Sequence, residues 1–385
     1  MNQIKQNLLG LTQDELVEFN IARGEPGYRG KQIFQWLYAK GVTDFRSMTD
    51  LGKAFRDRLT MEATIEGLTL VTRQCSALDG TTKYLLALPD GLQIESVLIP
   101  SSLEFNSNTS GGKEASAGRL TLCVSTQAGC PLGCTFCATA TMGLHRNLTA
   151  GEIVDQILQV KRISARLITN LVFMGMGEPM LNYENVMKAM EIITTGIGIA
   201  ARRVTISTAG LADRIRQMGE EKRKVKLAVS LHSAVDDTRS VLMPVNKRYD
   251  LASLISAVKY YYACTRQRVT YEHIFFDGVN DTDQEVAALV RYARQVPCKI
   301  NVIPFHSIAF TRPEGVSATL RPSPRMTEIV NHLRENNLSV FLRSNAGEDI
   351  EAACGQLAVQ NTKRRNARSN GSPRRADQAT ILAAT

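Results

Sequence analysis

The chain has 385 residues, of which 44% are hydrophobic and 22% are charged. These values are typical of a folded globular protein and exclude a disordered chain or a coiled coil. No apolar run approaches the roughly 18 residues that a membrane span requires, and the first residues lack the pattern of a secretory signal. We therefore expect a cytoplasmic protein with one large domain and a smaller appendage.

The net charge of +9 is concentrated near the end of the chain. Residues 361–385 contain six Lys and Arg residues and one Asp, in a context rich in Asn, Ser and Gly. This composition predicts a disordered basic tail that is attracted to polyanions. It favours a nucleic-acid partner only weakly, because many proteins carry such tails without a specific ligand.

The first 100 residues predict a small accessory domain, which we place at residues 1–90. Helical patterns cover residues 14–20, 30–40 and 51–59, and the second of these has one apolar face that we expect to be buried. From residue 68 to residue 100 the pattern alternates with period two and contains two Asp-Gly pairs, which predict β-hairpins. The apolar face of the second helix consists of Ile33, Phe34, Trp36 and Leu37.

A larger domain is predicted at residues 91–360. Near its start it contains a long loop, at residues 101–118, that is rich in Ser, Thr, Asn and Gly. Seven strand-like runs there alternate with amphipathic helical segments, which predicts an α/β fold with a parallel sheet, either doubly wound or a barrel. In both architectures the functional site lies at the C-terminal ends of the strands. We expect strands at residues 122–126, 170–176, 202–208, 226–232, 269–276, 299–305 and 339–344, and helices at residues 150–161, 182–194, 251–263, 283–293 and 324–335.

Four of the eight cysteines fall within fifteen residues, and three of them form a C-x3-C-x2-C motif: Cys130, Cys134 and Cys137. Three thiolates on one short loop can ligate three irons of a 4Fe–4S cluster and leave the fourth iron open. Structural zinc is the main alternative, but it usually takes four ligands from paired C-x2-C units, and the sequence has no second unit. The isolated cysteines are expected to be structural: Cys75, Cys264 and Cys298.

The motif and its place after the first strand resemble the radical S-adenosylmethionine (SAM) superfamily. This resemblance implies a partial barrel of six β/α units, with SAM bound at the open iron. Each candidate SAM-binding residue, taken alone, would more often be a satisfied structural residue, and their coincidence with strand ends carries the prediction. These residues are Gly177 and Glu178 in the run GMGEP, Ser207, Ser230, Leu231, His232 and His306. At the position of His306, the branch of the superfamily that this chain resembles usually has asparagine.

Three further motifs narrow the resemblance: IESVLIP around Glu95, TLCVSTQAGC around Cys123 and GEDIEAACGQL around Cys354. Together with FMGMGEP and VSLHS, they resemble the RlmN/Cfr family of RNA methyltransferases over roughly residues 10–357. The runs CKINVIPF and GEP are closer to the branch of that family that methylates adenine C2 than to the branch that methylates adenine C8.

The resemblance implies that Cys354 accepts a methyl group from one SAM and that a second SAM provides the radical that activates this methyl group. Glu95 would then take the C2 proton, and Cys123 would attack the sulfur to leave a Cys123–Cys354 disulfide for an intracellular reductant to reset. The substrates implied are an adenosine at the peptidyl-transferase centre of 23S rRNA and the adenosine 3′ of the anticodon in tRNA, each unstacked for reaction. We further expect flavodoxin or ferredoxin as electron donor, and a monomeric enzyme.

Three alternatives remain open at this point. A C8 methyltransferase would use the same catalytic residues, and a radical enzyme of other chemistry would need neither Cys123 nor Cys354. An RNA-binding protein with a zinc site or a degenerate cluster would contain no iron. Without the resemblance, Cys123 is more simply a small buried apolar residue and Glu95 a carboxylate on the solvent face of a strand.

Overall fold

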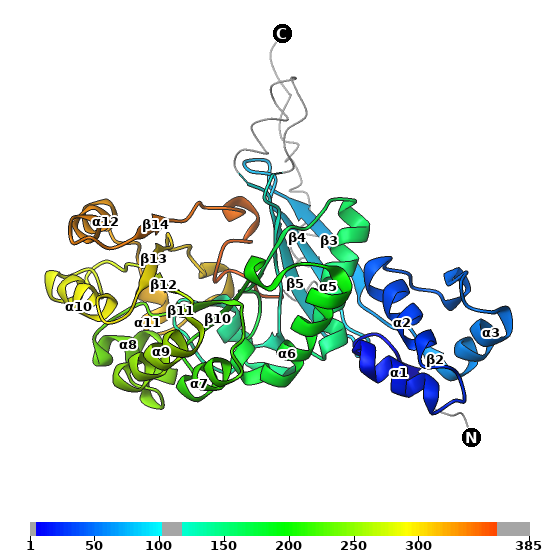
Figure 1. The fold of residues 1–385 in the computed structure, drawn as a ribbon. Helices are drawn as coiled ribbons and strands as arrows, with labels where there is room; N and C mark the ends of the chain where they lie inside the picture. The colour runs from blue at the N-terminus through cyan, green and yellow to red at the C-terminus, as the bar shows by residue number, and fades with distance from the viewer. Residues whose placement is uncertain (1–4, 102–117, 360–385) are drawn as a thin grey trace, which may run out of the picture.

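A computed structural model describes residues 5–101 and 118–359 (Figure 1). Nearly all of the loop predicted at residues 101–118, and the whole tail predicted at residues 361–385, therefore lie outside the described residues. No helix among the described residues is both long enough and apolar enough to cross a bilayer.

The N-terminal region is helical, as the apolar periodicity predicts. Helix α1 begins with a capping box, in which the Thr12 side chain and the Glu15 side chain each bond the other residue's backbone N–H. Ile33, Phe34 and Leu37 are buried and Trp36 is partly buried, so the predicted apolar face is confirmed. The helices are α1 (Gln13–Ile21), α2 (Tyr28–Phe34), which continues into a π-helical turn (Gln35–Ala39), and α3 (Lys53–Glu62); strand β1 (Gln6–Asn7) pairs with β2 (Ala63–Thr64).

A ten-stranded sheet forms the centre of the molecule, with the order β14-β13-β12-β11-β10-β9-β6-β5-β4-β3. Its larger part is parallel, which confirms the predicted α/β fold, and within the described residues its two edges, β14 and β3, are not paired with each other. The antiparallel strands are β3 (Thr69–Cys75), β4 (Thr82–Ala87) and β5 (Gln93–Ile99); the parallel ones are β6 (Thr121–Cys123), β9 (Asn170–Phe173), β10 (Val204–Thr208), β11 (Lys226–Ser230), β12 (Val269–His273), β13 (Cys298–Val302) and β14 (Val340–Leu342).

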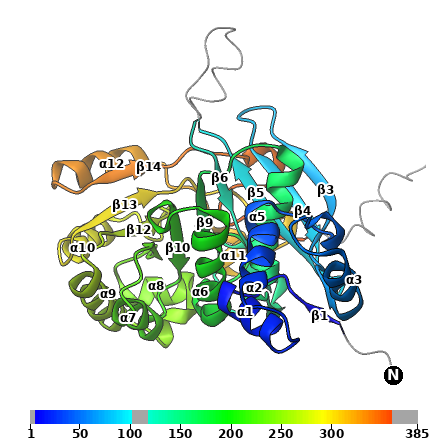
Figure 2. The same ribbon diagram turned by 45° about the vertical axis from the view of Figure 1, so that its right-hand side comes forward.

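Helices that connect successive parallel strands lie along the outer side of this sheet (Figures 1 and 2). The pattern predicted most of them but missed α7, α8 and the short α11. It also missed a small hairpin formed by β7 (Gln127–Gly129) and β8 (Leu144–Asn147). The helices are α5 (Ala150–Ser164), α6 (Tyr183–Ile192), α7 (Ala212–Glu220), α8 (Asp236–Leu242), α9 (Leu251–Thr265), α10 (Asp283–Ala293), α11 (Val316–Thr319) and α12 (Met326–Glu335).

The hairpin strands β3–β5 extend the catalytic sheet through the pairing of β5 with β6. The boundary that we place at residue 90 therefore lies between two strands of one sheet, β4 and β5. The division into an accessory domain at residues 1–90 and a catalytic domain at residues 91–360 stays a prediction.

Strand register places the candidate residues on one face of the sheet. Directly paired residues share a face, and so do residues two apart along a strand. The pairs Val97–Cys123, Cys123–Val172 and Val172–Thr205 link β5 to β10 across this face. By the same rule, the face carries Lys83, Glu95, Cys123, Ser207, Ser230, Glu272 and Asn301.

Arg239 on α8 is a fully buried cation that secures the C-terminal strand ends. Its Nε donates to the Leu231 carbonyl at 3.1 Å, and its Nη2 donates to the Ala209 carbonyl at 2.7 Å and to the Ser230 carbonyl at 3.1 Å. Since these carbonyls follow β10 and β11, one guanidinium fixes both strand ends. Its Nη1 also donates to Asn246 at 2.7 Å.

We predict that Arg239→Met lowers the free energy of unfolding by about 3 kcal/mol, because it leaves several buried acceptors without a donor. Denaturant titration of the variant and the parent protein measures this difference. Arg291→Met, on the exposed surface of α10, is the matched control and should change stability by no more than about 0.5 kcal/mol. Equal stabilities of the two variants would contradict the prediction.

Candidate active site

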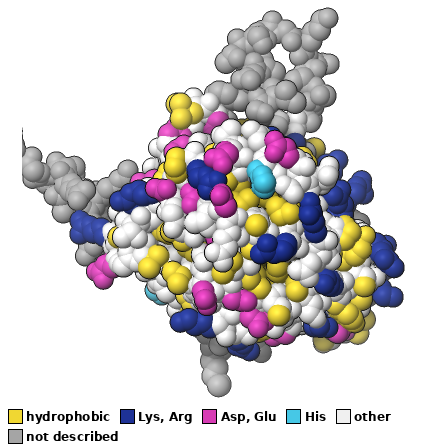
Figure 3. Space-filling view, turned by 90° about the vertical axis from the view of Figure 1, so that its left-hand side faces the viewer, with side chains coloured by type: hydrophobic (Ala, Val, Ile, Leu, Met, Phe, Trp, Pro, Cys, Tyr) yellow, Lys and Arg dark blue, Asp and Glu magenta, His cyan; other side chains and the backbone are white. Residues whose placement is uncertain are grey.

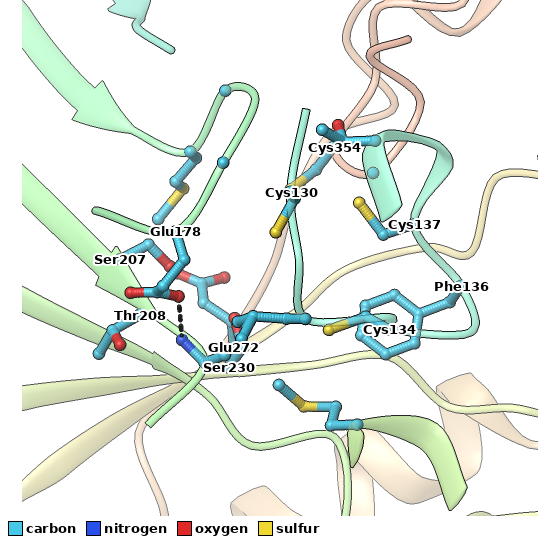
Figure 4. A pocket seen from close by; sticks show the side chains of 18 of the residues that line it. Cys130, Cys134, Phe136, Cys137, Glu178, Ser207, Thr208, Ser230, Glu272 and Cys354 are labelled. Carbon is cyan, nitrogen blue, oxygen red and sulfur yellow. Dashed lines mark hydrogen bonds between the residues drawn. The ribbon is translucent and has the colours of Figure 1, made fainter. Parts of the chain in front are cut away.

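A cavity opens at the C-terminal ends of the parallel strands, where the α/β pattern predicts the functional site. Its empty volume, which includes space open to solvent, is about 860 Å³. Figure 4 shows the three motif cysteines turned toward a common space, with Cys354 on the same side. The lining also includes the Gly-rich turn after β9 and the ends of β10, β11 and β12, represented by Gly177, Glu178, Ser207, Ser230, His232 and Glu272.

The cysteine loop begins directly after β7 and lies within the connection between the two strands of the β7–β8 hairpin. Gly129 adopts a φ of +81°, and a Cβ atom there would lie 1.9 Å from the Gly143 carbonyl oxygen, so the turn requires glycine. The Cys130 N–H donates to that same carbonyl at 2.8 Å. At the other end of the loop, the Ala138 N–H donates to the Gly355 carbonyl at 2.7 Å, which places the loop against the segment of Cys354.

The three cysteines fit an iron–sulfur cluster better than a single metal ion. Burial, and then the nearby Cys137, raise the pKa of Cys130 to about 12, and burial and the other two motif cysteines raise the pKa of Cys134 well above its usual value. Their ionised forms therefore require a cationic centre between them. Among the described residues, no three His, Cys, Asp or Glu side chains converge closely enough to hold one ion, whereas in a cluster each thiolate binds a different iron.

The turn after β9 packs closely on the segment before the cysteine loop. Gly177 has a φ of +95°, and a Cβ atom there would lie 2.4 Å from Gln127 Cβ. The Gln127 side chain also accepts the Glu178 N–H at 2.8 Å. The turn thus lies at the cavity wall because Gly177 permits this approach.

Glu178 is buried, and both of its carboxylate oxygens accept backbone N–H groups. One oxygen accepts Met180 N–H at 2.9 Å, and the other accepts Ala209 N–H at 2.8 Å, as the dashed line in Figure 4 marks. Burial raises its pKa to about 7, and these two N–H groups oppose that rise. Glu178 therefore joins the Gly-rich turn to the end of β10, in addition to the cofactor contact that we predict for it.

His232 is buried and neutral, with a left-handed backbone at φ +55°. Its Nδ1 accepts the Ile274 N–H at 3.1 Å, so the ring proton lies on Nε2. Burial lowers its pKa well below the usual value. Its ring centroid lies 4.4 Å from that of Phe136 in the cysteine loop, which presents the imidazole as a neutral donor at the cavity.

Two predicted SAM-binding residues lie outside the cavity lining. Leu231 is fully buried, and its backbone N–H donates to the Glu272 carbonyl at 3.0 Å. His306 is also buried, with its Nδ1 3.4 Å from Glu348 Oε1. The cofactor contacts that we predict for Leu231 and His306 stay predictions.

Of the three predicted catalytic residues, Cys354 lines the cavity, and Glu95 and Cys123 lie on one face of the sheet. Cys354 is exposed, whereas Cys123 is buried on β6. Burial, and then Cys354, raise the pKa of Cys123 to about 12, so the two thiols lie close enough to influence each other, and both are free. Glu95 is buried on β5, where burial raises its pKa to about 7, and its Oε2 has no hydrogen-bond partner.

The sequence pattern missed three charged residues near these thiols. Glu272 lines the cavity and accepts a hydrogen bond from Asn301 at 3.0 Å, with Arg343 Nη1 3.6 Å from its other oxygen. Burial raises the pKa of both Cys123 and Cys354, and Arg343 opposes this rise at both thiols. The third charged residue is Lys83, whose Nζ lies 3.4 Å from Glu95 Oε1. The rule that sites lie at strand ends could have found Glu272, but no local sequence signal indicates Arg343 or Lys83.

The comparisons with known proteins agree with this geometry. Residues 124–290 match the model of the radical SAM superfamily, and residues 6–65 match the model of a ribosomal RNA large subunit methyltransferase N-terminal domain. The chain is 41% identical over 379 residues to the dual-specificity RNA methyltransferase RlmN of Desulfotalea psychrophila, covering 95% of this chain and 98% of that protein. The chain belongs to the RlmN family.

One further relative and one solved structure support the assignment. The dual-specificity RNA methyltransferase RlmN of Campylobacter fetus is 42% identical over 358 residues, which cover 91% of this chain and 98% of that protein. The solved structure of a radical SAM methyltransferase from Sphaerobacter thermophilus has a TM-score of 0.80 and 40% identity, and covers 91% of this chain and 99% of that one. The family resemblance and the radical SAM fold predicted from the sequence are therefore confirmed.

We predict that Gly177→Ala lowers the free energy of unfolding by about 2 kcal/mol more than Gly198→Ala does. Both positions have a positive φ, but a Cβ at Gly177 collides with Gln127, whereas nothing lies within 4 Å of a Cβ at Gly198. Urea unfolding of both variants isolates the steric cost. A difference below about 0.5 kcal/mol would show that the turn moves away without penalty.

Proposed function

We propose that this protein is a radical SAM RNA methyltransferase that adds a methyl group to C2 of adenosine, in 23S rRNA at the peptidyl-transferase centre and in tRNA 3′ of the anticodon. The observation that carries the proposal is the presence of Cys354 and Cys123 beside the cysteine motif, since other radical chemistry needs neither thiol. The relatives' names, dual-specificity RNA methyltransferase RlmN, support the same substrates.

Cys130, Cys134 and Cys137 would hold the 4Fe–4S cluster, with Gly177, Glu178, Ser207, Ser230 and His232 around the SAM beside it. When bound, the cluster supplies the electron that cleaves SAM to a hydrogen-abstracting 5′-deoxyadenosyl radical. The neutral His232 would offer its Nε2–H to SAM, because its Nδ1 already accepts the Ile274 N–H.

The chain's own residues carry the methyl carbon and release the product. The Cys354 thiolate accepts a methyl group by displacement, and after one hydrogen atom is removed from this group, its carbon forms a bond to adenine C2. Glu95 takes the C2 proton, and the Cys123 thiolate attacks the Cys354 sulfur. The adduct radical must first have given up one electron, for which the oxidised cluster would be the acceptor. The carbon–sulfur bond then breaks with its electron pair on the methylene carbon, which takes up a proton to become the methyl group of the product. The two cysteines are left as a disulfide that an intracellular reductant must reduce.

This scheme consumes two molecules of SAM per turnover, one as methyl donor and one for hydrogen abstraction. It also requires an electron donor such as flavodoxin or ferredoxin, and we propose a monomeric enzyme that acts in the cytoplasm. A target adenine must leave its stack before its C2 atom can reach Cys354.

We place RNA docking on the N-terminal helices. Tyr28, Lys31 and Lys40 are exposed there, and Lys40 Nζ lies 3.2 Å from the centroid of the Trp36 ring. Figure 3 shows a different face, where Lys and Arg side chains are interspersed with those of Asp and Glu, so that face does not present a single basic patch. A protein surface that carries both cationic and aromatic side chains can bind RNA, because the cations attract phosphates and the aromatic rings stack on bases.

The mass of the Cys354 peptide tests the methyl-carrier role. We expect this peptide, from protein made together with iron–sulfur assembly factors, to be heavier by one methyl group or its methylene-derived equivalent. The same peptide from Cys130→Ala, which cannot complete the cluster, should be unmodified. Unmodified Cys354 in protein with a full cluster would exclude this mechanism and favour a radical enzyme of other chemistry.

The position of methylation distinguishes the two branches of the RlmN/Cfr family. We expect nucleoside mass spectrometry of a reacted 23S rRNA transcript and a reacted tRNA to show 2-methyladenosine in both. Detection of 8-methyladenosine instead would assign the protein to the C8 branch, which uses the same catalytic residues.

A further inference from the structure

Glu95 has a buried cationic neighbour on the next strand of the sheet. Lys83 on β4 and Glu95 on β5 are 8% and 5% exposed, and Lys83 Nζ lies 3.4 Å from Glu95 Oε1. The other carboxylate oxygen, Oε2, has no hydrogen-bond partner. One oxygen of the proposed base is thus paired with a cation, and the other is free to accept a proton.

The position of Lys83 is fixed from a distant part of the chain. Its Nζ donates to the Glu351 carbonyl at 3.1 Å, in the loop that leads to Cys354. The same loop is held independently, because Asp79 Oδ2 accepts the Gly347 N–H at 2.8 Å. Loss of the Lys83 ammonium would therefore leave this loop attached to the β3–β4 hairpin.

The charged groups that act on Glu95 are Lys83 and Glu351, and they act in opposite directions. The remaining contacts are with neutral groups: the Ser125 hydroxyl donates to the Glu95 carbonyl at 2.6 Å, and the backbone N–H of Ala358 favours the carboxylate. Lys83 is the cation that opposes the desolvation of this carboxylate and its repulsion by Glu351.

We propose that Lys83 is a positioning residue for the reaction: its ammonium group keeps Glu95 in the carboxylate form and holds one of its oxygens, so that the other faces the proton to be removed. The inference rests on the function proposed above. The proton taken from adenine C2 goes to Glu95 Oε2. A buried carboxyl group with no such partner would be a neutral acid and could not act as a base.

The role of Lys83 can be measured in the step that releases the RNA from Cys354. Reconstituted holoenzyme carrying methylated Cys354 is mixed with a 23S rRNA transcript, SAM and reductant, and the covalent protein–RNA adduct is followed on denaturing gels over a series of pH values. In the parent protein, adduct resolution should accelerate as the pH rises through about 7, where Glu95 loses its proton. In Lys83→Met, the midpoint should move upward by about one to three pH units.

Three variants separate the charge from other roles of the side chain. Lys83→Arg keeps the cation and should keep the parent pH profile, whereas Lys83→Gln keeps a donor for the Glu351 carbonyl and should shift as Lys83→Met does. Lys83→Gln also serves if the apolar Met side chain prevents folding. Lys259→Met, on exposed α9, is the matched control and should behave as the parent protein does.

The outcomes distinguish this inference from the proposed function. Absence of any adduct with the parent protein would overturn both. If Lys83→Met and Lys83→Gln form the adduct normally and resolve it with the pH profile of the parent protein, the role of Lys83 alone is overturned. Retained methylation of Cys354 in these variants, together with a profile shifted to higher pH, would support it.

Discussion

The active-site geometry depends on a buried hydrogen-bond network where the antiparallel hairpin joins the parallel sheet. The side-chain carbonyl of Gln156, on α5, accepts the Ser96 hydroxyl and the Ser125 N–H, each at 2.8 Å. The Gln156 amide donates back to the Ser125 carbonyl at 2.9 Å, and the Ser125 hydroxyl donates to the Glu95 carbonyl at 2.6 Å and accepts the Met176 N–H at 2.9 Å. One fully buried amide therefore fixes β5, β6 and the Gly-rich turn together, and such a network is stable only when all its members are paired.

The charge balance of the site follows from its burial. Desolvation raises the pKa values of Cys123, Cys130, Cys354, Glu95 and Glu178, so the chain alone favours neutral thiols and carboxylic acids there. The proposed chemistry needs several of these groups as anions. Arg343 and Lys83 offset part of this cost, and a bound cluster with a sulfonium cofactor would supply further positive charge.

The sequence predicts well those features that depend on short spacings. Period-two and helical patterns placed all seven parallel strands, and the rule that sites lie at strand ends placed Ser207, Ser230 and His232 at the cavity. The sequence does not predict contacts between residues that are far apart in the chain. The Lys83–Glu351 hydrogen bond joins residues 268 positions apart, and no local periodicity encodes that contact. The same limit applies to His306, whose Nδ1 lies 3.4 Å from Glu348 Oε1.

The segment around Cys354 meets two opposing requirements. Its sulfur has to reach a methyl donor, an RNA base and Cys123 in turn, which requires exposure, yet each encounter needs a defined geometry. The structure fastens the segment before Cys354 through Asp79 and Lys83, and after it through the Gly355 carbonyl, while Cys354 as a residue remains exposed. Because the anchors lie within a few residues on either side, they restrict the backbone entropy of the loop and still leave Cys354 at the cavity. A carrier cysteine on a strand would gain the geometry but lose this access, as the burial of Cys123 shows.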